Sequence, residues 1–517
     1  MRDKVKGVMG GALLLTVAGL LVKVIGMIYK IPLTNQLGDE GMGYFNTAYT
    51  VYTFFFVLSS SGLPTALSLS VSRELASRGE REAKKRYAVM ARFSAWLGFS
   101  LFLLLCLLAR PIAFLLSSPK AYLAILSVSP AIWFITAASA ERGFWQGRSH
   151  MLPTALSQLV EAIGKLIFGL FMIALATRLA LTSEKVAAYA ILGLSFATFL
   201  TYLILKLFFR EKGMRSLMVT PSERRMLLLD TLKTAFPITV ASLSATLASS
   251  LDLILLMRSL QSIGYTPDAA NAAWGNYSAM VLPLFHMPQV VLTPIALSIL
   301  PALRGAFSKN DEKTAKALIK SALVITALVG ALASLGLSLF AKDALSLIYT
   351  DEAAIAHAYP HLALLAIAIF PFGIMTVTAS ILQAEGRLWL PTVSLAIGAL
   401  TKALVTLLFV ESLGEAVSAI GTLVSYTVAS AINFAALTAK RRSVSTLALT
   451  AKPFLVASIS VAVGLLVQGL CYRRGIPESF ATLVSIASCA LMALVFTILT
   501  KTLTKDDLAA LGVQGKK

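Results

Sequence analysis

Charged residues, cysteine and histidine are all scarce in this sequence. Charged side chains make up 14% of the 517 residues, hydrophobic side chains make up 57%, and the mean hydropathy is +0.80. A soluble domain needs a more polar surface, so this composition excludes one. The apolar runs are about 20 residues long, which suits helices that cross a bilayer and exceeds the strands of a membrane barrel. The sequence therefore predicts an all-α polytopic membrane protein.

The few cysteines and histidines offer little for metal or redox chemistry. The three cysteines lie in or at the ends of apolar segments, without metal-ligand or disulfide spacing, and we interpret them as packing residues. Of the four histidines, only His357 and His361 share a helical spacing, and we interpret them as solvated residues at the outer start of a helix. We expect no metal site, no catalytic residue and no enzymatic activity.

Acidic residues are also few, which leaves a formal net charge of +20. In a soluble protein this excess would indicate nucleic-acid binding, but here the basic residues fall in short loops between apolar runs, where they orient a membrane protein. We therefore expect no nucleic-acid partner. The charged run from Arg78 to Arg86 is interpreted in the same way, as a solvated loop.

The apolar runs number about fourteen. If they alternate across the membrane from a cytoplasmic N-terminus, 33 of the 45 lysines and arginines fall on the cytoplasmic side. This bias predicts a bacterial cytoplasmic-membrane protein with both termini in the cytoplasm. The first run holds Lys23 and has no small-residue cleavage site, so we expect a retained helix. The expected spans lie near 8–29, 44–71, 90–109, 121–140, 153–176, 187–206, 235–257, 276–300, 321–341, 359–382, 391–410, 416–438, 453–471 and 480–500.

A weak internal repeat relates two parts of the chain that are about 230–240 residues apart. Each copy holds six expected spans, an even number, so both copies have the same orientation in the membrane. We expect two six-helix lobes in a parallel pseudo-twofold repeat, at 1–210 and 234–440, a cytoplasmic linker at 211–233, and two extra helices with a cytoplasmic tail at 441–517. The recurring landmarks are Leu63-Pro64-Thr65-Ala66-Leu67-Ser68 with Thr293-Pro294-Ile295-Ala296-Leu297-Ser298, Gly147-Arg148 with Gly386-Arg387, Pro153-Thr154 with Pro391-Thr392, and Lys165 with Lys402.

Two facing six-helix lobes are typical of an alternating-access transporter, whose cleft opens to one side of the membrane and then to the other. A channel fits less well, because the sequence has neither a filter-like loop nor a short ring-forming unit. A GxxxxGK[ST] motif is absent as well. Transport must then be driven by an ion gradient, by the membrane potential or by the substrate gradient.

Charged residues within the spans are costly in lipid and are therefore candidates for function. Lys23 lies deep in the first span, where it either lines the cavity between the lobes or snorkels to the surface. Glu161 and Lys165 are four residues apart on the fifth span, so they share a helix face and can pair. Glu161 either belongs to a structural ion pair or binds a coupling ion. Lys402 is the equivalent of Lys165 in the repeat.

Three further features of the spans each allow two interpretations. Arg142, beside Trp145, either grips a phosphate at the cytoplasmic mouth of the cleft or anchors the helix at the interface. Asp252, deep in the seventh span, either takes Na⁺ or H⁺ as the coupling ion or pairs with a cation. No other cofactor is expected. The eighth span is either a moving part or a static kink, because it carries Pro283, Pro288, Pro294 and Pro301.

The sign of the charges within the spans indicates the charge of the expected substrate. Basic candidates outnumber acidic ones, and a cationic cleft favours an anionic substrate over the lipophilic cations that drug exporters carry. The basic candidates are Lys23, Arg142, Lys165 and Lys402, and the acidic ones are Glu161 and Asp252.

Four short motifs lie in or beside the first, second and fourth expected spans. They are Lys23-Val24-Ile25-Gly26, Leu37-Gly38-Asp39-Glu40-Gly41-Met42-Gly43-Tyr44, Ser61-Gly62-Leu63-Pro64-Thr65-Ala66 and Arg142-Gly143-Phe144-Trp145-Gln146-Gly147. Together they resemble the polysaccharide-transporter branch of the multidrug/oligosaccharidyl-lipid/polysaccharide exporter superfamily. The likeness covers nearly the whole chain and is closest to the group of stage V sporulation protein B and MurJ-type lipid II flippases of Gram-positive bacteria.

The resemblance implies a flippase that moves an undecaprenyl-pyrophosphate-linked sugar from the cytoplasmic to the outer leaflet, with basic cavity residues on the pyrophosphate. Lys23 stands where the family commonly has a cavity arginine. A second family arginine has no clear equivalent here, and Lys30 is the basic residue in that region. The last two spans are similar to a pair that forms a groove for the lipid tail.

Several functions compete at this point. The leading one is a flippase for peptidoglycan lipid II, followed by a flippase for a capsular or teichoic-type lipid-linked oligosaccharide. A cation-coupled multidrug antiporter would instead depend on acidic residues. A scaffold for protein partners in envelope assembly would tolerate Lys23→Ala and Arg142→Ala without loss.

Overall fold

The structure is a computed structural model that describes residues 2–209, 211, 219–440, 446–500 and 502. Helices make up nearly all of these residues, and the described ranges contain no strand. The all-α prediction is therefore confirmed. Part of the expected linker, residues 212–218, and the expected tail beyond 502 lie outside the described residues. The chain divides into two compact units, Met1–Gly275 and Asn276–Lys517.

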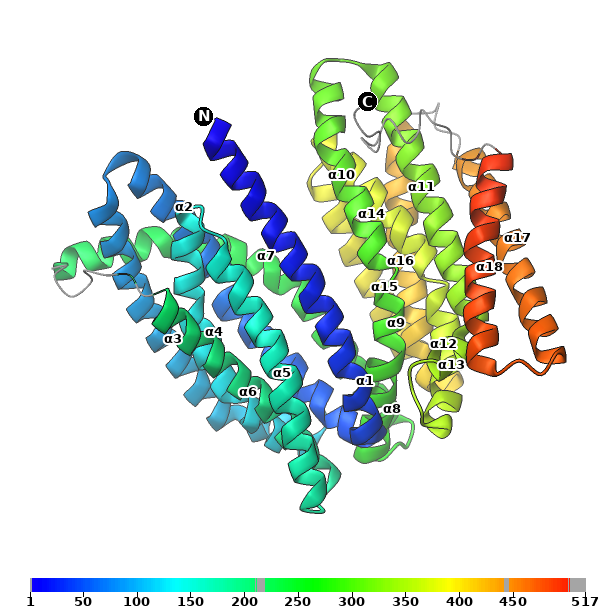
Figure 1. Cartoon of the computed structure of the whole chain (residues 1–517), viewed down its shortest axis with the longest axis horizontal. Helices are drawn as coiled ribbons and strands as arrows, with labels where there is room; N and C mark the ends of the chain where they lie inside the picture. The colour runs from blue at the N-terminus through cyan, green and yellow to red at the C-terminus, as the bar shows by residue number, and fades with distance from the viewer. Residues whose placement is uncertain (1, 210, 212–218, 441–445, 501, 503–517) are drawn as a thin grey trace. The chain divides into compact units, whose positions relative to one another are not determined.

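The first unit is a bundle of long helices in which α5 packs on α6, while α4 packs on both α3 and α6 (Figure 1). α1 contacts α4, α5 and α7. α8 (Pro267–Asn276) follows at the boundary between the units. The helices are α1 (Arg2–Ser60), α2 (Gly62–Ser77), α3 (Glu80–Leu115), α4 (Tyr122–Gly147), α5 (Leu152–Arg178), α6 (Ser183–Phe208) and α7 (Pro221–Ser262), with a short turn η1 (Pro119–Ala121) before α4.

Small residues let the helices of this unit approach closely, as is usual where lipid supplies no hydrophobic drive for association. A Cβ added to Gly193 on α6 would lie 2.5 Å from the backbone nitrogen of Gly169 on α5. A Cβ on Gly143 of α4 would lie 2.7 Å from the carbonyl oxygen of Pro64 on α2. A cluster of buried apolar side chains near these contacts includes Leu67 and Phe144.

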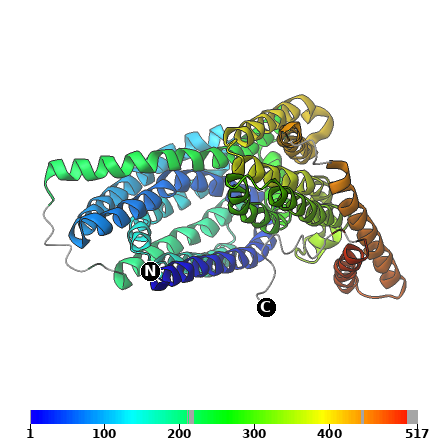
Figure 2. The same ribbon diagram turned by 90° about the horizontal axis from the view of Figure 1, so that it is seen from above.

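The second unit packs α15 on α16, α14 on α10, α11 and α16, and α17 on α11. α17 and α18 lie side by side in Figure 1 and Figure 2, as expected for the last two spans. The elements are η3 (Tyr277–Val281), α9 (Leu282–His286), α10 (Gln289–Ser308), α11 (Glu312–Leu339), α12 (Ala341–Ser346), α13 (Glu352–Ala366), α14 (Ile369–Ala384), α15 (Trp389–Leu413), η4 (Gly414–Ala416), α16 (Val417–Lys440), α17 (Thr446–Arg473) and α18 (Glu478–Leu499).

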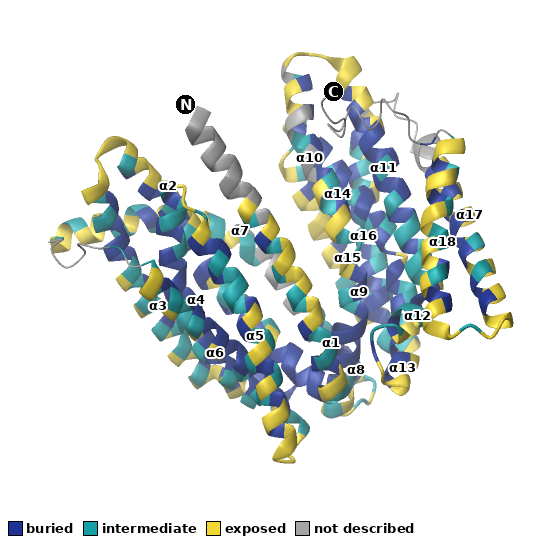
Figure 3. Ribbon diagram, viewed as in Figure 1, coloured by how far each residue is buried: buried dark blue, intermediate teal, exposed yellow. Residues whose placement is uncertain are grey.

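Large apolar side chains face outward along many of these helices. Leu107, Leu408 and Leu466 are each at least 69% exposed, which is the pattern of a surface that meets lipid. Exposed positions run along α18 as a visible stripe (Figure 3). Among the described residues, ten helical segments are long and apolar enough to cross a membrane, or eleven if one bent pair counts as a single span. The chain is therefore a multi-pass membrane protein.

The count of fourteen spans stays a prediction, because several expected spans run together. Val17–Ser77 contains the first two expected spans and Trp389–Ala439 contains the eleventh and twelfth. Within α1 the chain kinks at Gly38, where φ is 63° and ψ is −176°. The polar residues around Gly38 separate the first two expected spans, and a second helix begins directly after the kink.

The proline-rich eighth span is broken, as the sequence predicted. The pair Pro267–His286 and Gln289–Ala296 is bent by 45° at Met287-Pro288. Proline lacks the N–H that would continue the helical ladder, which explains the break. Whether the segment moves stays a prediction. The two compact units divide after Gly275, and α7 belongs to the first unit. The expected lobes at 1–210 and 234–440, with their linker at 211–233, stay a prediction.

Candidate functional site

The candidate site is a group of basic and aromatic side chains in the first unit, carried by α1, α4 and α5. Arg142, near the end of α4, places its Nη2 3.1 Å from Oε2 of Glu161 on α5. Its Nε donates to Oγ of Ser157, one turn earlier on α5, at 2.9 Å. The Arg142 and Glu161 side chains are 12% and 23% exposed. Two contacts thus hold the Arg142 guanidinium against α5, and they use only some of its five N–H donors.

Lys165 makes a different kind of contact. Its Nζ lies 5.6 Å from the centroid of the Tyr29 ring and 5.9 Å from that of Tyr49, both on α1. These are cation–π distances, at which the negative ring face attracts an ammonium. The sequence allowed a pair between Glu161 and Lys165, but the Glu161 carboxylate bonds to Arg142 from the neighbouring helix instead. The charge of Lys165 is therefore held by rings that do not neutralise it.

The Tyr29 ring is fixed by close helix packing. It is 3% exposed, and a Cβ added to Gly169 on α5 would lie 2.5 Å from its Oη. No hydrogen-bond partner of this Oη occurs among the described residues. Gly169 thus allows α1 to approach α5, and the approach places the Tyr29 ring against Lys165.

Lys30 and Lys23 extend the basic group along α1. Lys30 is half-buried on α1 and directly follows Tyr29, whose ring faces Lys165. Lys23 is exposed and precedes Lys30 by seven residues, or two helical turns, which puts both on the same side of α1. The first unit therefore carries four of the predicted basic residues, Lys23, Lys30, Arg142 and Lys165. We call Lys30, Lys165, Arg142, Tyr29 and Tyr49 the cationic cluster.

The remaining predicted residues lie elsewhere. Asp252 is half-buried on α7, in the first unit. Lys402 is half-buried on α15, in the second unit, and its Cγ would lie 3.1 Å from a Cβ added to Gly421 of α16. The proposed roles of these two residues in ion coupling and substrate binding stay predictions.

Aromatic and small polar residues of the site escaped the sequence reasoning. Tyr29, Tyr49 and Ser157 fall in apolar helices where such residues are ordinary, and only their position beside a costly charge marks them. Phe45, Tyr49 and Tyr52 form a run of rings along α1 with centroids 6.2 and 5.7 Å apart. Phe45 and Tyr52 are buried, so Tyr49 is the ring of this run that is exposed and lies beside Lys165.

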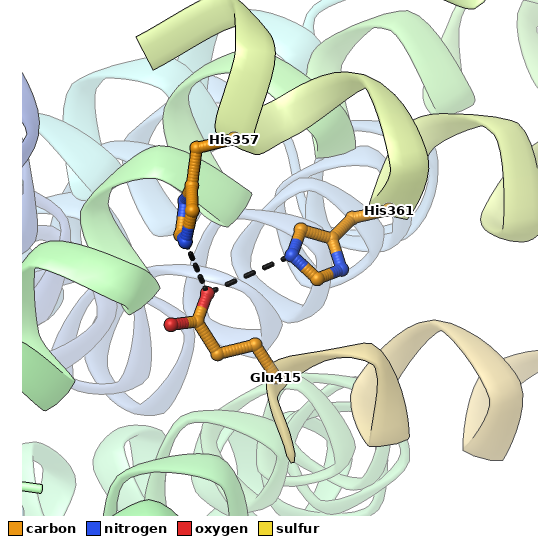
Figure 4. A group of neighbouring side chains, drawn as sticks. All are labelled: His357, His361 and Glu415. Atoms are coloured by element: carbon orange, nitrogen blue, oxygen red, sulfur yellow. Dashed lines mark ion pairs between the residues drawn. The ribbon is translucent and has the colours of Figure 1, made fainter. Parts of the chain in front are cut away.

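Two predictions about solvated charges are wrong. Arg86 was assigned to a solvated loop, yet its side chain is 5% exposed, with Nη2 2.7 Å from Glu74 Oε1 and Nη1 2.8 Å from Asp230 Oδ2. A buried arginine needs such partners, and both come from neighbouring helices that local sequence cannot show. His361 was also taken as solvated, but its side chain is 13% exposed and faces Glu415 (Figure 4).

Comparison with known proteins agrees with this architecture. Residues 8–307, more than half of the chain, match the model of the polysaccharide biosynthesis protein family. The chain belongs to this family. Residues 261–408 also match the model of the MatE family. The resemblance seen in the sequence motifs is thereby confirmed.

Two proteins of one bacterium are similar to this chain over most of its length. Stage V sporulation protein B of Bacillus subtilis (strain 168) is 22% identical over 66% of this chain and 67% of its own. Lipid II flippase MurJ of the same organism is 25% identical over 76% of this chain and 75% of its own.

A solved structure of a lipid II flippase MurJ in an inward closed conformation superimposes with a TM-score of 0.72 at 14% identity, covering 95% of this chain and 99% of that one. At this identity the match establishes a shared fold, and it supports the assignment of the chain as a multi-pass membrane protein.

Proposed function

We propose that this protein is a flippase for an undecaprenyl-pyrophosphate-linked cell-envelope precursor, with lipid II as the first candidate. It moves the precursor from the inner to the outer leaflet by alternating access. The observation that carries the proposal is the cationic cluster, where Lys165 is held by two tyrosine rings while Arg142 is held by Glu161 and Ser157. Similarity to a lipid II flippase and to stage V sporulation protein B supports it.

The chemistry of the cluster suits a pyrophosphate. An ammonium inside a membrane span raises the free energy of insertion by about 3 kcal/mol, so a lysine there is a candidate for function. A ring face orients the ammonium and leaves its charge and its three donors for an anion. Lys30, directly after Tyr29 on α1, adds a second basic side chain to this part of the first unit. Together they match the multiple negative charges of a pyrophosphate group.

The rest of the cargo would meet apolar and aromatic surfaces. The Tyr49 ring lies 5.9 Å from Nζ of Lys165 and is 37% exposed, so it provides a stacking face for a sugar ring. The long isoprenoid tail needs a lipid-exposed apolar path. α17 and α18 pack on each other and carry exposed Leu466 and Leu494, so we assign the tail to this pair.

A capsular or teichoic-type lipid-linked oligosaccharide is the second candidate, because the same cluster would bind its phosphate groups. A multidrug antiporter fits less well. Such an antiporter needs an acidic residue for its cationic cargo, whereas the Glu161 carboxylate bonds to Arg142. Asp252 remains the better candidate for a coupling ion, Na⁺ or H⁺.

Complementation tests the proposal. A bacterium whose own lipid II flippase can be switched off would receive wild type, Lys165→Ala or Lys23→Ala, with membrane levels verified. Lys185→Ala is the matched control, because Lys185 is an exposed lysine at the start of α6. We expect wild type and Lys185→Ala to restore growth and Lys165→Ala to fail.

Failure of well-expressed wild type would count against lipid II and favour another lipid-linked saccharide as the cargo. Rescue by every variant, including a double substitution of Lys165 and Lys30, would count against binding through the cationic cluster. It would place lipid II binding at other residues of the chain.

A further inference from the structure

A second cluster of polar side chains lies within the second unit. His357 and His361 stand on α13 and direct their Nε2 atoms toward one oxygen of Glu415, in η4 (Figure 4). Nε2 of His357 is 3.1 Å from Glu415 Oε2, and Nε2 of His361 is 3.6 Å from the same atom. We call these three residues the His–Glu cluster. The proposed transport function does not use it.

Local sequence holds all three side chains in place. The two histidines are four residues apart, so they lie on one face of α13. The start of α13 is fixed by Asp351, whose Oδ1 accepts from the backbone N–H groups of Ala353 and Ala354 at 3.0 and 3.1 Å. Glu415 follows Gly414, which ends α15 with φ of 53° and ψ of −132°. The cluster thus joins a capped helix start to a tight turn between two long helices.

The spacing of the ligand atoms suits a metal ion. One nitrogen from each histidine and one carboxylate oxygen all lie within 4.8 Å of one another. A tetrahedral zinc site with ligands about 2.0–2.1 Å from the metal has ligand atoms about 3.3–3.4 Å apart. The separations of Glu415 Oε2 from the two Nε2 atoms, 3.1 and 3.6 Å, bracket that value, and the ligand nitrogens of the two histidines lie within 4.8 Å of each other.

The exposure of the three residues leaves one open position. The His361 and Glu415 side chains are 13% and 14% exposed, whereas His357 is 46% exposed. An ion can enter from the His357 side, and water can complete its coordination there. Nδ1 of His361 is buried without a hydrogen-bond partner among the described residues, so this ring makes its polar contact through Nε2.

Hydrogen bonding alone accounts for only part of this arrangement. Glu415 Oε2 is within hydrogen-bond reach of His357 but lies 3.6 Å from His361, beyond that reach. Two imidazoles aimed at one carboxylate oxygen are what a shared cation would organise. Two nitrogen ligands with one carboxylate favour zinc over magnesium or calcium, which prefer oxygen ligands.

We propose that His357, His361 and Glu415 bind one zinc ion, with water as the remaining ligand. The ion ties the start of α13 to the turn between α15 and α16. It would stiffen this end of the second unit without taking part in substrate binding.

Zinc titration of the full-length protein tests this proposal. The protein is purified in detergent through a tag without histidine, stripped with a chelator, and titrated with zinc chloride against a chromophoric competitor. We expect one zinc per chain for wild type, and affinity lower by more than about tenfold for Glu415→Gln and His361→Asn. The control His150→Asn removes an exposed histidine of the first unit and should bind like wild type.

Folding of the variants is checked by their melting temperatures without metal, and Glu415→Gln carries the test if His361→Asn does not fold, because it keeps the shape of the side chain. We expect zinc to raise the melting temperature of wild type and not that of Glu415→Gln. Cobalt should give wild type the intense visible absorption of a tetrahedral site. Absence of a one-to-one site in wild type, or equal affinity in Glu415→Gln and wild type, would overturn the proposal.

Discussion

The Nζ atom of Lys165 lies 5.6 Å from the centroid of the Tyr29 ring, which is almost fully buried between α1 and α5. A carboxylate in that place would cancel the lysine charge, whereas a ring face holds it and leaves it available. Arg142, on the neighbouring helix, is instead paired with the Glu161 carboxylate, which neutralises its charge. Lys165 is therefore the better candidate of the two for binding an anion.

Replacing Tyr29 tests the ring directly. A cation–π contact contributes about 0.5–2 kcal/mol, so Tyr29→Leu should weaken affinity for a pyrophosphate-linked lipid about 2- to 30-fold. Tyr29→Phe keeps the ring and removes an Oη that has no hydrogen-bond partner among the described residues, so it should bind nearly like wild type. Binding titrations with purified protein give the comparison. Equal losses in the two variants would show that the hydroxyl matters and not the ring face.

Close packing of α5 on α6 makes a second prediction. Gly193→Ala would bring a Cβ to 2.5 Å from the backbone nitrogen of Gly169, so the helices must separate. We expect a loss of stability of about 1–3 kcal/mol, seen as a lower melting temperature in detergent. The control is Gly336→Ala on α11, where nothing lies within 4 Å of the added Cβ. A melting temperature for Gly193→Ala equal to that of the control would contradict this packing.

The buried Arg86 predicts a large electrostatic effect. Arg86→Ala would leave Glu74, whose side chain is 4% exposed, without its closest cation. Breaking a buried pair in this way costs about 3–5 kcal/mol of folding free energy. Arg81→Ala, at an exposed position in the same helix, should cost far less. Thermal unfolding of both variants gives the comparison. Similar melting temperatures would show that Arg86 is solvated, as the sequence suggested, and that its ion pairs do not stabilise the fold.

A pH effect is expected at Glu223, near the start of α7 and outside the expected membrane span. Lys85, 2.8 Å away, lowers the pKa of this carboxyl below its ordinary value of 4.5. A lowered pKa in the folded state stabilises the fold above pH 4.5, and this contribution is lost as the pH falls through the folded-state pKa. Glu223→Gln should therefore lower the melting temperature at neutral pH and have no effect at strongly acidic pH. A deficit that persists in acid would show that the ion pair is not responsible.

Much of the fold follows from the sequence because long apolar runs have one stable form in lipid. The polar residues around Gly38 indicate a break after the first expected span, and the backbone is non-helical there. The surroundings of charged residues between spans were harder to predict. Arg86 was misplaced because its partner Asp230 is on α7 and far along the chain. A local pattern of charges carries no information about such partners.

The sequence likewise predicted some residues of the candidate site and missed others. Arg142 and Lys165 stood out because a charge in a membrane helix is costly. Glu161 stood out for the same reason, whereas Tyr29 and Ser157 did not, because a tyrosine or a serine is unremarkable in an apolar span. Glu415 lay beyond sequence reasoning as well, since only the fold brings its turn to the histidines of α13.

The most direct test of the central claim is leaflet exchange in proteoliposomes. Purified wild type, Lys165→Ala and Lys185→Ala would be reconstituted with fluorescent lipid II or with an uncharged isoprenoid-linked sugar, and the label on the outer leaflet would be quenched over time. We predict that wild type and Lys185→Ala exchange lipid II quickly, that Lys165→Ala is slower by at least about tenfold, and that the uncharged lipid is not moved. Equal exchange of both lipids by wild type and Lys165→Ala would contradict the account.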